Sequence, residues 1–422
     1  MHILFVTENF PPERNAAASR VYERACYWVR WGHQVTVITS APNFPEGKVH
    51  PGYRNRWHQV EQRDGIRVVR VKTFIAANEG VVLRTLDFLS FMVTSFFGGL
   101  MERRPDVVVA TSPQFFAAVA GCVLAAVRRR PFVFELSDLW PASITAVGAM
   151  RDNAGLRMVE RLELLMYRRA AKIVALTRAF KSDLVARGVP PDKVAVVING
   201  VDMARYAPRV RDRQLARELG LEGRFVIGYI GTHGMAHALE RVLDAADLLR
   251  ERPAIQFLFV GPGAAREGLV RDAARRGLTN VRLVPAQPKE SMPAYWSLCD
   301  LALVHLKDTP LFRTVIPSKI FEAMAMGRPI VLAAPDGEAA DIIRTTGAGV
   351  VLPAEDPQAL AAAVSDLSAA PQRVAEMSRR SLAAAPLFTR EKQARDMLKI
   401  IEEAAPSAPE SLEGFRSASV GK

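Results

Sequence analysis

The residues best suited to chemistry lie in one stretch, residues 317–329 (PSKIFEAMAMGRP). A proline at its start suits the first turn of a helix, where no backbone N–H is needed, and the Gly-Arg-Pro at its end stops a helix. That first turn exposes unpaired N–H groups and the positive end of the helix dipole, which favour phosphate. We therefore predict a diphosphate site at the backbone of Ser318 and Lys319, with the Lys319 ammonium as an added charge.

Glu322 lies on the same predicted turn. A carboxylate is a natural acceptor for the two hydroxyls of a ribose, so Glu322 beside a diphosphate site indicates a nucleotide. An acidic residue near a helix amino terminus is also favoured by capping alone. Both interpretations of Glu322 stay open at this point.

Two upstream loops with closely spaced glycines follow apolar runs. They are residues 228–234 (GYIGTHG) and 261–263 (GPG). Glycine lets a backbone approach a phosphate closely, although neither loop has the GxGxxG spacing of a dinucleotide fold and each could be a plain turn. Because both loops end strands of the half that carries Glu322, we predict donor contacts there. The residues are Gly231, Thr232, His233, Gly261 and Gly263.

Short apolar runs alternate with amphipathic stretches along most of the chain, a pattern typical of βαβ units in a doubly wound parallel sheet. The first half predicts strands at His2–Val6, Gln34–Thr39, Ile66–Val71, Asp106–Ala110, Phe132–Glu135, Lys172–Leu176 and Val194–Val197. The second half repeats the pattern at Phe225–Ile230, Gln256–Val260, Val281–Val284, Leu301–His305, Pro329–Leu332 and Gly349–Leu352. In such sheets ligands bind at the carboxyl ends of the strands.

A chain of 422 residues is too long for one hydrophobic core, so the fold class expected is α/β with two Rossmann-like domains facing across a cleft. We expect an acceptor-binding domain over residues 1–202 and a nucleotide-binding domain over residues 203–385. Residues 386–405 are expected to form a helix that packs back toward the first domain. The polar, Pro- and Ser-rich residues 406–422 predict a disordered tail.

The amino-acid composition limits the classes of partner that can be expected. The net charge is +12, and residues 1–202 hold 27 Lys and Arg against 18 Asp and Glu. This bias favours anionic partners. Nucleic acid is not expected, because no aromatic RNP motif, zinc finger or basic heptad region occurs. Three scattered cysteines predict neither disulfides nor a zinc site, and indicate the reduced cytosol. The first residues lack the features of a signal peptide.

Residues 81–104 are strongly apolar and end in Arg103-Arg104. The longest apolar run within them, about 14 residues, is too short to span a bilayer. A core helix is the simplest interpretation. A surface that contacts an anionic membrane is the alternative, because apolar burial and basic residues together bind acidic lipids.

In this order the motifs are similar to those of the GT-B retaining glycosyltransferases of family 4. The resemblance is greatest to the branch that builds bacterial O-antigens and capsules and includes N-acetyl-L-fucosamine transferases, and it covers roughly residues 1–400. The motifs are the opening strand with Pro11-Pro12, residues 32–38 (GHQVTVI), 111–116 (TSPQFF), 135–141 (ELSDLWP), 198–202 (INGVD), 317–329 and 347–349 (GAG).

The resemblance assigns roles to several of these positions. Glu322 matches the second acid of the family's Glu-x7-Glu signature, which binds the nucleotide ribose. The first acid is replaced by Thr314, so a carboxylate pair cannot carry catalysis here. The family's phosphate-binding Arg and Lys are replaced by Thr232 and His237, and Lys319 is the expected substitute. His237 either shares that work or is an ordinary surface histidine.

Other assignments fall in the first half. Asp138 follows the strand 132–135 where the family contacts the sugar, so we expect it to touch the transferred sugar or the incoming hydroxyl. Its alternative is to cap a helix after Trp140-Pro141. Asn15 lies in a loop expected to face the donor phosphates and the acceptor, where alanines replace the family's glycines. Residues 199–202 are expected to support a hinge, with Gly200 giving conformational freedom.

The implied reaction transfers a sugar from a nucleoside diphosphate, with a uridine donor and an N-acetylated or 6-deoxy amino sugar favoured. The anomeric configuration is retained, and a donor phosphate oxygen takes the acceptor proton. A lipid-linked saccharide or polyprenyl diphosphate is the expected acceptor. No DxD loop or HExxH motif occurs, so neither a metal nor a cofactor is expected.

Three other functions are alternatives to this reaction. A dinucleotide-dependent dehydrogenase would need GxGxxG and a following acid, which are missing. A nucleotide-sugar 2-epimerase would share the architecture and need no acceptor. A non-catalytic partner subunit would follow if Thr314 and the missing basic pair had removed the activity. The last two remain open from the sequence.

Overall fold

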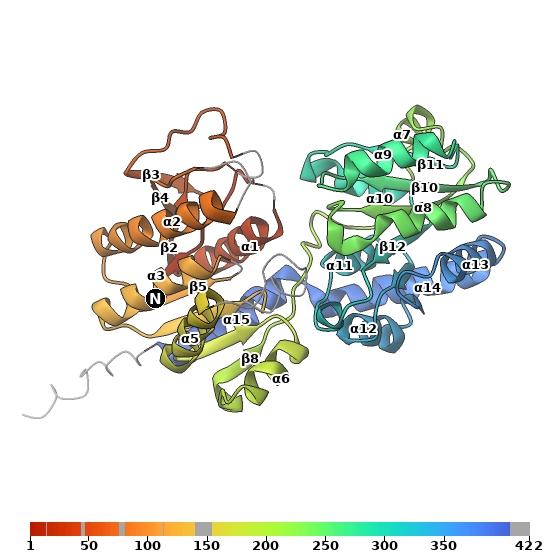
Figure 1. Ribbon diagram of the computed structural model, residues 1–422. Coiled ribbons are helices and arrows are strands. Elements are labelled where there is room, and N and C mark those ends of the chain that lie inside the picture. Colours follow the sequence, from red (N-terminus) through yellow and green to blue (C-terminus); the bar gives the residue numbers. More distant parts are fainter. Residues whose placement is uncertain (14, 44–46, 76–80, 113, 140–153, 406–422) are drawn as a thin grey trace, which may run out of the picture.

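The computed structural model describes residues 1–13, 15–43, 47–75, 81–112, 114–139 and 154–405. Within them the chain forms two halves, each a parallel or mainly parallel sheet with helices on both faces (Figure 1). The α/β class with two Rossmann-like domains is confirmed. Every strand expected from the sequence is present, with ends that differ by at most one residue.

The first half contains an eight-stranded sheet in the order β3-β4-β2-β1-β5-β6-β7-β8. The strands are β1 His2–Val6, β2 Gln34–Ser40, β3 His58–Arg63, β4 Ile66–Val71, β5 Val107–Thr111, β6 Phe132–Leu136, β7 Lys172–Ala175 and β8 Val194–Val196. Edge strand β3 pairs antiparallel with β4 and was not predicted. It is polar and partly exposed, and its turn at Asp64-Gly65 has the positive φ angles typical of a tight hairpin.

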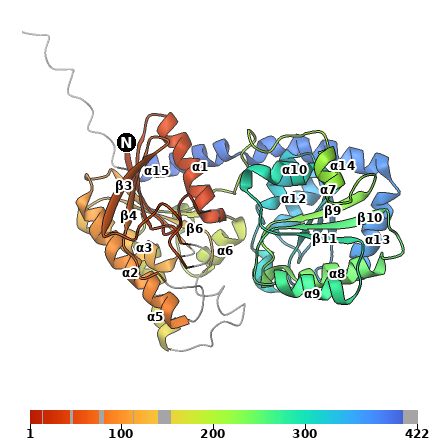
Figure 2. The ribbon, with the colours of Figure 1, turned by 90° about the horizontal axis from the view of Figure 1, so that it is seen from above.

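Helices cover both faces of this sheet (Figure 2). They are α1 Ala16–Arg30, α2 Val81–Met101, α3 Phe115–Arg128, α5 Ala154–Arg169, α6 Arg178–Ala186 and α15 Arg390–Ala404. Alternate residues of β1 divide the core. Leu4 and Val6 join the cluster under α2, α3 and α5, and Ile3 and Phe5 join the cluster under α1 and α15.

The second half contains a six-stranded parallel sheet in the order β11-β10-β9-β12-β13-β14. The strands are β9 Phe225–Ile230, β10 Ile255–Val260, β11 Val281–Val284, β12 Leu301–His305, β13 Ile330–Ala333 and β14 Gly349–Leu352. The helices are α7 Arg213–Glu218, α8 Leu239–Leu248, α9 Arg266–Arg275, α10 Met292–Leu298, α11 Lys319–Ala325, α12 Glu338–Thr346, α13 Pro357–Ser368 and α14 Pro371–Ala384.

In each sheet the strand order reverses at one position. The reversal lies between β1 and β5 in the first sheet and between β9 and β12 in the second. The loops on either side of such a reversal diverge, which opens a crevice at the carboxyl ends of the strands. Both crevices therefore collect loops that follow β1, β5, β9 and β12.

The chain passes between the halves twice, and the two passages pair with each other. Val201 N donates to Phe388 O at 2.9 Å, and Arg390 N donates to Val201 O at 2.8 Å. A Cβ on Gly200 would lie 2.5 Å from Thr389 O. Gly200 therefore permits a close approach of two backbones, a reason for the glycine that the sequence did not indicate.

Gly200→Ala should destabilise the protein by about 2–3 kcal/mol, because the new methyl group meets backbone that cannot move cheaply. Urea unfolding measures this loss. The control is Gly268→Ala within α9, where a Cβ would have nothing within 4 Å. That change should raise stability by about 0.5–1 kcal/mol through helix propensity alone. Equal midpoints for the two variants would contradict the packing argument.

Candidate functional site

Two loops of the second half are locked together at the carboxyl ends of β9 and β10. His233 N donates to Pro262 O at 2.6 Å, and Gly231 N donates to Val260 O at 2.9 Å. Gly231, Gly261 and Gly263 have φ angles of 141°, 146° and 150°, which other residues rarely adopt. A Cβ on Gly261 would lie 2.1 Å from Gly231 O. This close packing of the two loops requires the glycines. It also brings together the five residues that were predicted to contact the sugar donor.

The Lys319 side chain lies beneath the first of these loops. Its Nζ is 3.5 Å from the ring centroid of Tyr229 and has no hydrogen-bond partner among the described residues. It would be 3.1 Å from a Cβ on Gly231. Burial lowers the pKa of the Lys319 ammonium to about 7, and Glu322 offsets this only in part. Among the described residues, this buried amino group therefore has no carboxylate within ion-pair distance.

Lys319 was expected to add a point charge at the first turn of this helix, and the structure shows that its side chain is buried. The ammonium is buried, so it must leave the Tyr229 ring before it can contact a phosphate. A lysine side chain has the rotatable bonds for such a movement. An anion above the loop would supply the charge that the resting site lacks.

Three histidines surround this lysine, and all have lowered pKa values. Burial, with Lys319 as the next cause, lowers the pKa of His233 to about 4 and that of His237 to about 3. Burial also lowers the pKa of His305, whose Nδ1 lies 2.7 Å from His237 O. His237, which is half-buried, is therefore uncharged near pH 7. Neutral histidines add no positive charge to the site, so the charge for an anion comes from Lys319.

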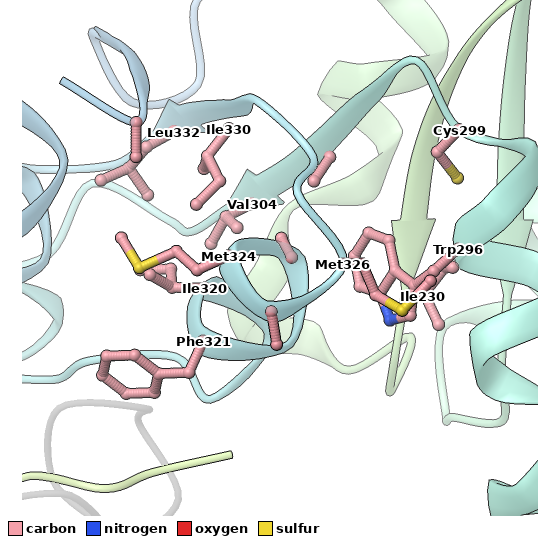
Figure 3. Packing of buried hydrophobic residues seen from close by; sticks show 14 of the residues in the cluster. Ile230, Trp296, Cys299, Val304, Ile320, Phe321, Met324, Met326, Ile330 and Leu332 are labelled. Carbon is pink, nitrogen blue, oxygen red and sulfur yellow. The ribbon is translucent and has the colours of Figure 1, made fainter. Parts of the chain in front are cut away.

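Helix α11, which carries Lys319 and Glu322, is seven residues long and starts at Lys319 rather than at the proline. Its apolar side is packed into the core, where Ile320 and Met324 lie beside Val304, Ile330 and Leu332 (Figure 3). The amides of residues 320–322 already donate to the carbonyls of Pro317 and Ser318. The amides predicted to bind phosphate are those of Ser318 and Lys319, on a rigidly held helix.

Glu322 lies among side chains that sequence patterns did not point to. Trp296 Nε1 donates to Glu322 Oε2 at 3.3 Å, and the Tyr206 side chain interacts with the same carboxylate. Burial raises the pKa of Glu322, whereas Lys289 and the Trp296 hydrogen bond act in the other direction. Trp296 and Tyr206 come from α10 and from the passage between the halves, so no spacing near Glu322 reveals them.

Glu23 of α1 connects the first half to this region through three cations. Its carboxylate lies 2.8 Å from Lys289 Nζ, 2.8 Å from Arg390 Nε and 3.1 Å from an Arg205 nitrogen. Burial by itself raises the pKa of Glu23, but Arg390 and Lys289 outweigh it and lower the pKa to about 2. Lys289 also lowers the pKa of Glu322 electrostatically, so it acts on the carboxylates of both Glu23 and Glu322.

Asp138 lies directly after β6, at the crevice of the first half. The Ser112 hydroxyl accepts from the backbone amides of Ser137 and Asp138, at 2.8 and 3.2 Å, which holds the backbone at the strand end. The helix that Asp138 would cap falls in residues 140–153, outside the described part of the chain. Asn15 caps α1 by accepting from Ala18 N at 2.8 Å, so its side chain is already engaged.

A buried ionic triad supports the same strand end. Glu135 on β6 pairs with Arg24 at 2.7 Å and with Arg20 at 3.2 Å, and Arg20 also donates to the Ser137 hydroxyl. Burial by itself raises the pKa of Glu135, but the two arginines lower it to about 2. The triad fixes α1 to β6 directly before Asp138. The sequence shows Glu135 only as part of a motif and does not reveal its arginine partners.

Thr314, at the position of the family's first acid, does not replace a carboxylate. Its hydroxyl donates to Leu311 O at 2.7 Å, within the same turn. It can still accept one hydrogen bond, although it brings no charge. Among the described residues, no group of three or more His, Cys, Asp or Glu side chains is arranged to hold a metal ion. No described helix has both the length and the apolar composition to cross a bilayer.

Asp138→Asn should lower turnover by about 100-fold if the carboxylate contacts the sugar or the acceptor hydroxyl. The melting temperature should not change, since asparagine has the same shape. Asp356→Asn is the control, because Asp356 caps α13 by accepting from Ala359 N, and asparagine caps equally well. Near-normal turnover of Asp138→Asn with normal melting would exclude the catalytic role.

Comparison with known proteins identifies the family of both halves. Residues 15–200 match the family described as "Glycosyl transferase 4-like domain", and residues 224–370 match "Glycosyl transferases group 1". The chain is 27% identical to the putative colanic acid biosynthesis glycosyl transferase WcaI of Escherichia coli, over 79% of this chain and 83% of the relative. It is 29% identical to a GDP-mannose-dependent alpha-mannosyltransferase of Mycobacterium tuberculosis, over 90% of this chain and 92% of that one.

Solved structures share the fold. A sucrose-phosphate synthase from Thermosynechococcus elongatus superposes with a TM-score of 0.77 at 17% identity, covering 95% of this chain and 98% of its own. Anabaena HepE, solved with UDP and glucose, gives 0.71 at 19% identity, covering 95% and 99%. These structures and the two mainly parallel sheets define a GT-B fold. The two matched family models cover both halves of the chain, so the chain belongs to the family-4-like glycosyltransferases.

Proposed function

We propose that this protein transfers a sugar from a UDP-sugar to a lipid-linked acceptor, with retention of configuration and without a metal ion. One observation carries the proposal. The uncompensated Lys319 ammonium and the Glu322 carboxylate lie on one rigid helix, beside the strand reversal between β9 and β12. A cation for a diphosphate next to a carboxylate for a ribose diol is the arrangement that a nucleoside diphosphate requires.

In the reaction, the bond between the sugar C1 and the diphosphate oxygen breaks, and the electron pair leaves with the diphosphate. Lys319 and the amides of Ser318 and Lys319 stabilise the negative charge that develops there. The acceptor hydroxyl forms its bond to C1 on the same face, and its proton passes to an oxygen of the departing phosphate. Asp138 holds the sugar or the acceptor hydroxyl from the first half. No step needs a carboxylate at position 314.

The donor sugar we propose is an N-acetylated, 6-deoxy hexosamine of the L-fucosamine type, and the acceptor a polyprenyl diphosphate-linked saccharide. The relative WcaI is named for colanic acid biosynthesis, which is consistent with a surface polysaccharide. The mannosyltransferase relative is named for GDP-mannose, so GDP is the base that competes with uridine. With a lipid-linked acceptor, the protein works at the inner face of the cytoplasmic membrane.

Calorimetric titration with UDP, GDP and their sugar derivatives in excess EDTA tests the proposal. We expect UDP to bind without a metal, and full turnover of the correct donor and acceptor in EDTA. Loss of binding in EDTA would overturn the metal-free mechanism, and preference for GDP would overturn the base. Release of an epimerised sugar without an acceptor would identify a 2-epimerase. Tight binding without turnover on any acceptor would identify a non-catalytic subunit.

A further inference from the structure

The outward side of α2 is apolar, which is unusual for a helix on the face of a sheet. The inward side carries buried Phe91 and Ser95, and two glycines that bring the helix close to the sheet. The opposite side should then be polar. Instead it presents large apolar side chains along the whole helix, and Phe97 and Met101 are 59% and 67% exposed. The exposed apolar side chains on α2 are Leu83, Leu86, Val93, Phe97 and Met101.

This stripe is long and continues onto the next helix. The 21 residues of α2 extend about 30 Å, and the stripe follows the i, i+3, i+4 spacing of one helix side. On the adjacent helix α3, Val123 and Val127 are also exposed. Helices α2, α3 and α5 lie on the same face of the sheet (Figure 2). Single exposed apolar residues are ordinary, but a continuous row marks an interaction surface.

Arginines collect at one end of this surface. Because α2, α3 and α5 each connect parallel strands, all three end at the same edge of the sheet, and each ends in basic residues. Arg128 at the end of α3 donates to Glu102 O at 2.9 Å, which places it beside the end of α2. The cluster consists of Arg103, Arg104, Arg128, Arg129, Arg130, Arg168 and Arg169.

Carboxylates near this cluster are occupied by other groups. Glu102 pairs with Arg67 at 2.7 Å and lies 3.7 Å from His58, and Asp106 accepts from the His2 amide at 2.7 Å. Arg104 and Arg128 donate to backbone carbonyls instead. The seven arginines form no ion pair with a carboxylate in the described part of the chain. Their charge is available to an external anion.

We infer that the apolar side of α2 and α3, together with this arginine cluster, docks onto an anionic lipid surface. The inference rests on the proposed function, because a lipid-linked acceptor requires the enzyme to reach a membrane. The apolar side chains would enter the acyl boundary, and the arginines would meet acidic head groups. A second copy of this chain fits less well, because neither α2 nor α3 presents an exposed carboxylate that could pair with the arginine cluster.

The stripe also has a direction. The amino end of α2, with Leu83 and Leu86, lies at the carboxyl edge of the sheet where the crevice opens, and its other end lies at the arginine cluster. Lying lengthwise on a bilayer, α2 would bring the crevice of the first half to the lipid surface. A lipid-linked acceptor could then reach the crevice without leaving the membrane.

Flotation of the full-length protein tests this inference. We expect binding to vesicles of phosphatidylethanolamine and phosphatidylglycerol and little binding to pure phosphatidylcholine. The double change Phe97→Ser with Met101→Ser should weaken the binding about tenfold or more, since two exposed side chains lose their apolar burial. The double change Arg103→Ser with Arg104→Ser should also weaken vesicle binding, and this loss should be larger at low salt than at high salt. Leu248→Ser on α8 of the second half, 55% exposed, is the matched control and should bind as the parent does.

Equal flotation of the parent and the Phe97/Met101 variant, or equal binding to both kinds of vesicle, would overturn the inference. A dimer in solution that this variant dissolves would also overturn it and assign the surface to self-association. UDP titration without vesicles separates this inference from the proposed function. The surface variant should bind UDP normally, whereas a failure of the parent to bind any nucleotide would count against the function alone.

Discussion

Replacing Glu322 by alanine should weaken UDP binding by about 10- to 100-fold, as measured by calorimetry. The reason is the loss of charged hydrogen bonds to the ribose hydroxyls, whose combined net contribution of about 1.4–2.8 kcal/mol corresponds to that change in affinity. The binding of 2′,3′-dideoxy-UDP should change far less, because it has no diol to lose. Turnover at saturating donor should fall less than kcat/KM, since the contact exists before and during the reaction.

Two variants sharpen this expectation. Glu322→Gln keeps an acceptor for Trp296 and should fall between the parent and the alanine variant. Glu267→Ala removes another acidic residue from the first turn of a helix in the same half, and it should leave UDP binding unchanged. If Glu322→Ala binds UDP like the parent, Glu322 is only a helix-capping residue and the donor site lies elsewhere.

Lys319→Met should make the protein more stable and nearly inactive at the same time. Removing an unpaired buried ammonium relieves its desolvation, so we expect the melting temperature to rise by about 1–4 °C. The kcat/KM should fall by about 100- to 1,000-fold, because no other group replaces the charge that stabilises the leaving diphosphate. Lys399→Met, at an exposed position of α15, should alter neither quantity.

The lowered pKa of Lys319 also fixes the direction of a pH effect. The group titrates near pH 7 in the folded protein and near 10.5 when unfolded. Between these values the unfolded chain binds more protons, so the lysine's unfavourable effect on stability diminishes as pH rises from about 7 to about 10.5. The difference in stability between Lys319→Met and the parent should therefore be largest at or below pH 7 and shrink above it.

Binding of the donor should also change the protonation of Lys319. Above pH 7 the ammonium is largely deprotonated, and a bound diphosphate favours its charged form. The protein should then take up part of a proton on binding UDP at pH 8, which calorimetry in buffers of different ionisation enthalpy detects. Lys319→Met should lose that uptake. A parent that binds UDP without proton uptake, together with a destabilised Lys319→Met, would contradict the buried-cation site.

The elements could be predicted because their signals are local. Buried parallel strands such as Phe225–Ile230 are continuous apolar runs, and the predicted ends of these strands agree with the structure to within one residue. Strand β3 was not predicted, because its residues are polar and partly exposed at a sheet edge. The sequence also does not reveal why residue 200 is a glycine, because the backbone that it approaches lies nearly two hundred residues further along the chain.

The candidate site could be predicted only where one segment contains it. Residues 317–322 pointed to a nucleotide, and the structure places Lys319 and Glu322 on one helix. What surrounds them comes from distant segments. Tyr229 under the lysine, Trp296 at the carboxylate and the Glu23 cluster depend on tertiary packing, which no spacing reveals. The charge state of His237 depends on the same packing.

The return of α15 to the first half has a consequence for how the chain acquires its structure during synthesis. Ala394, Met397 and Ile401 complete the apolar cluster of α1, and Trp28 Nε1 donates to Ala394 O at 2.9 Å. A nascent chain therefore lacks one covering layer of its first half until translation has passed residue 404. The second half can close on itself earlier, so the domain made first is finished last. A fragment ending before α15 would leave that layer exposed and should aggregate.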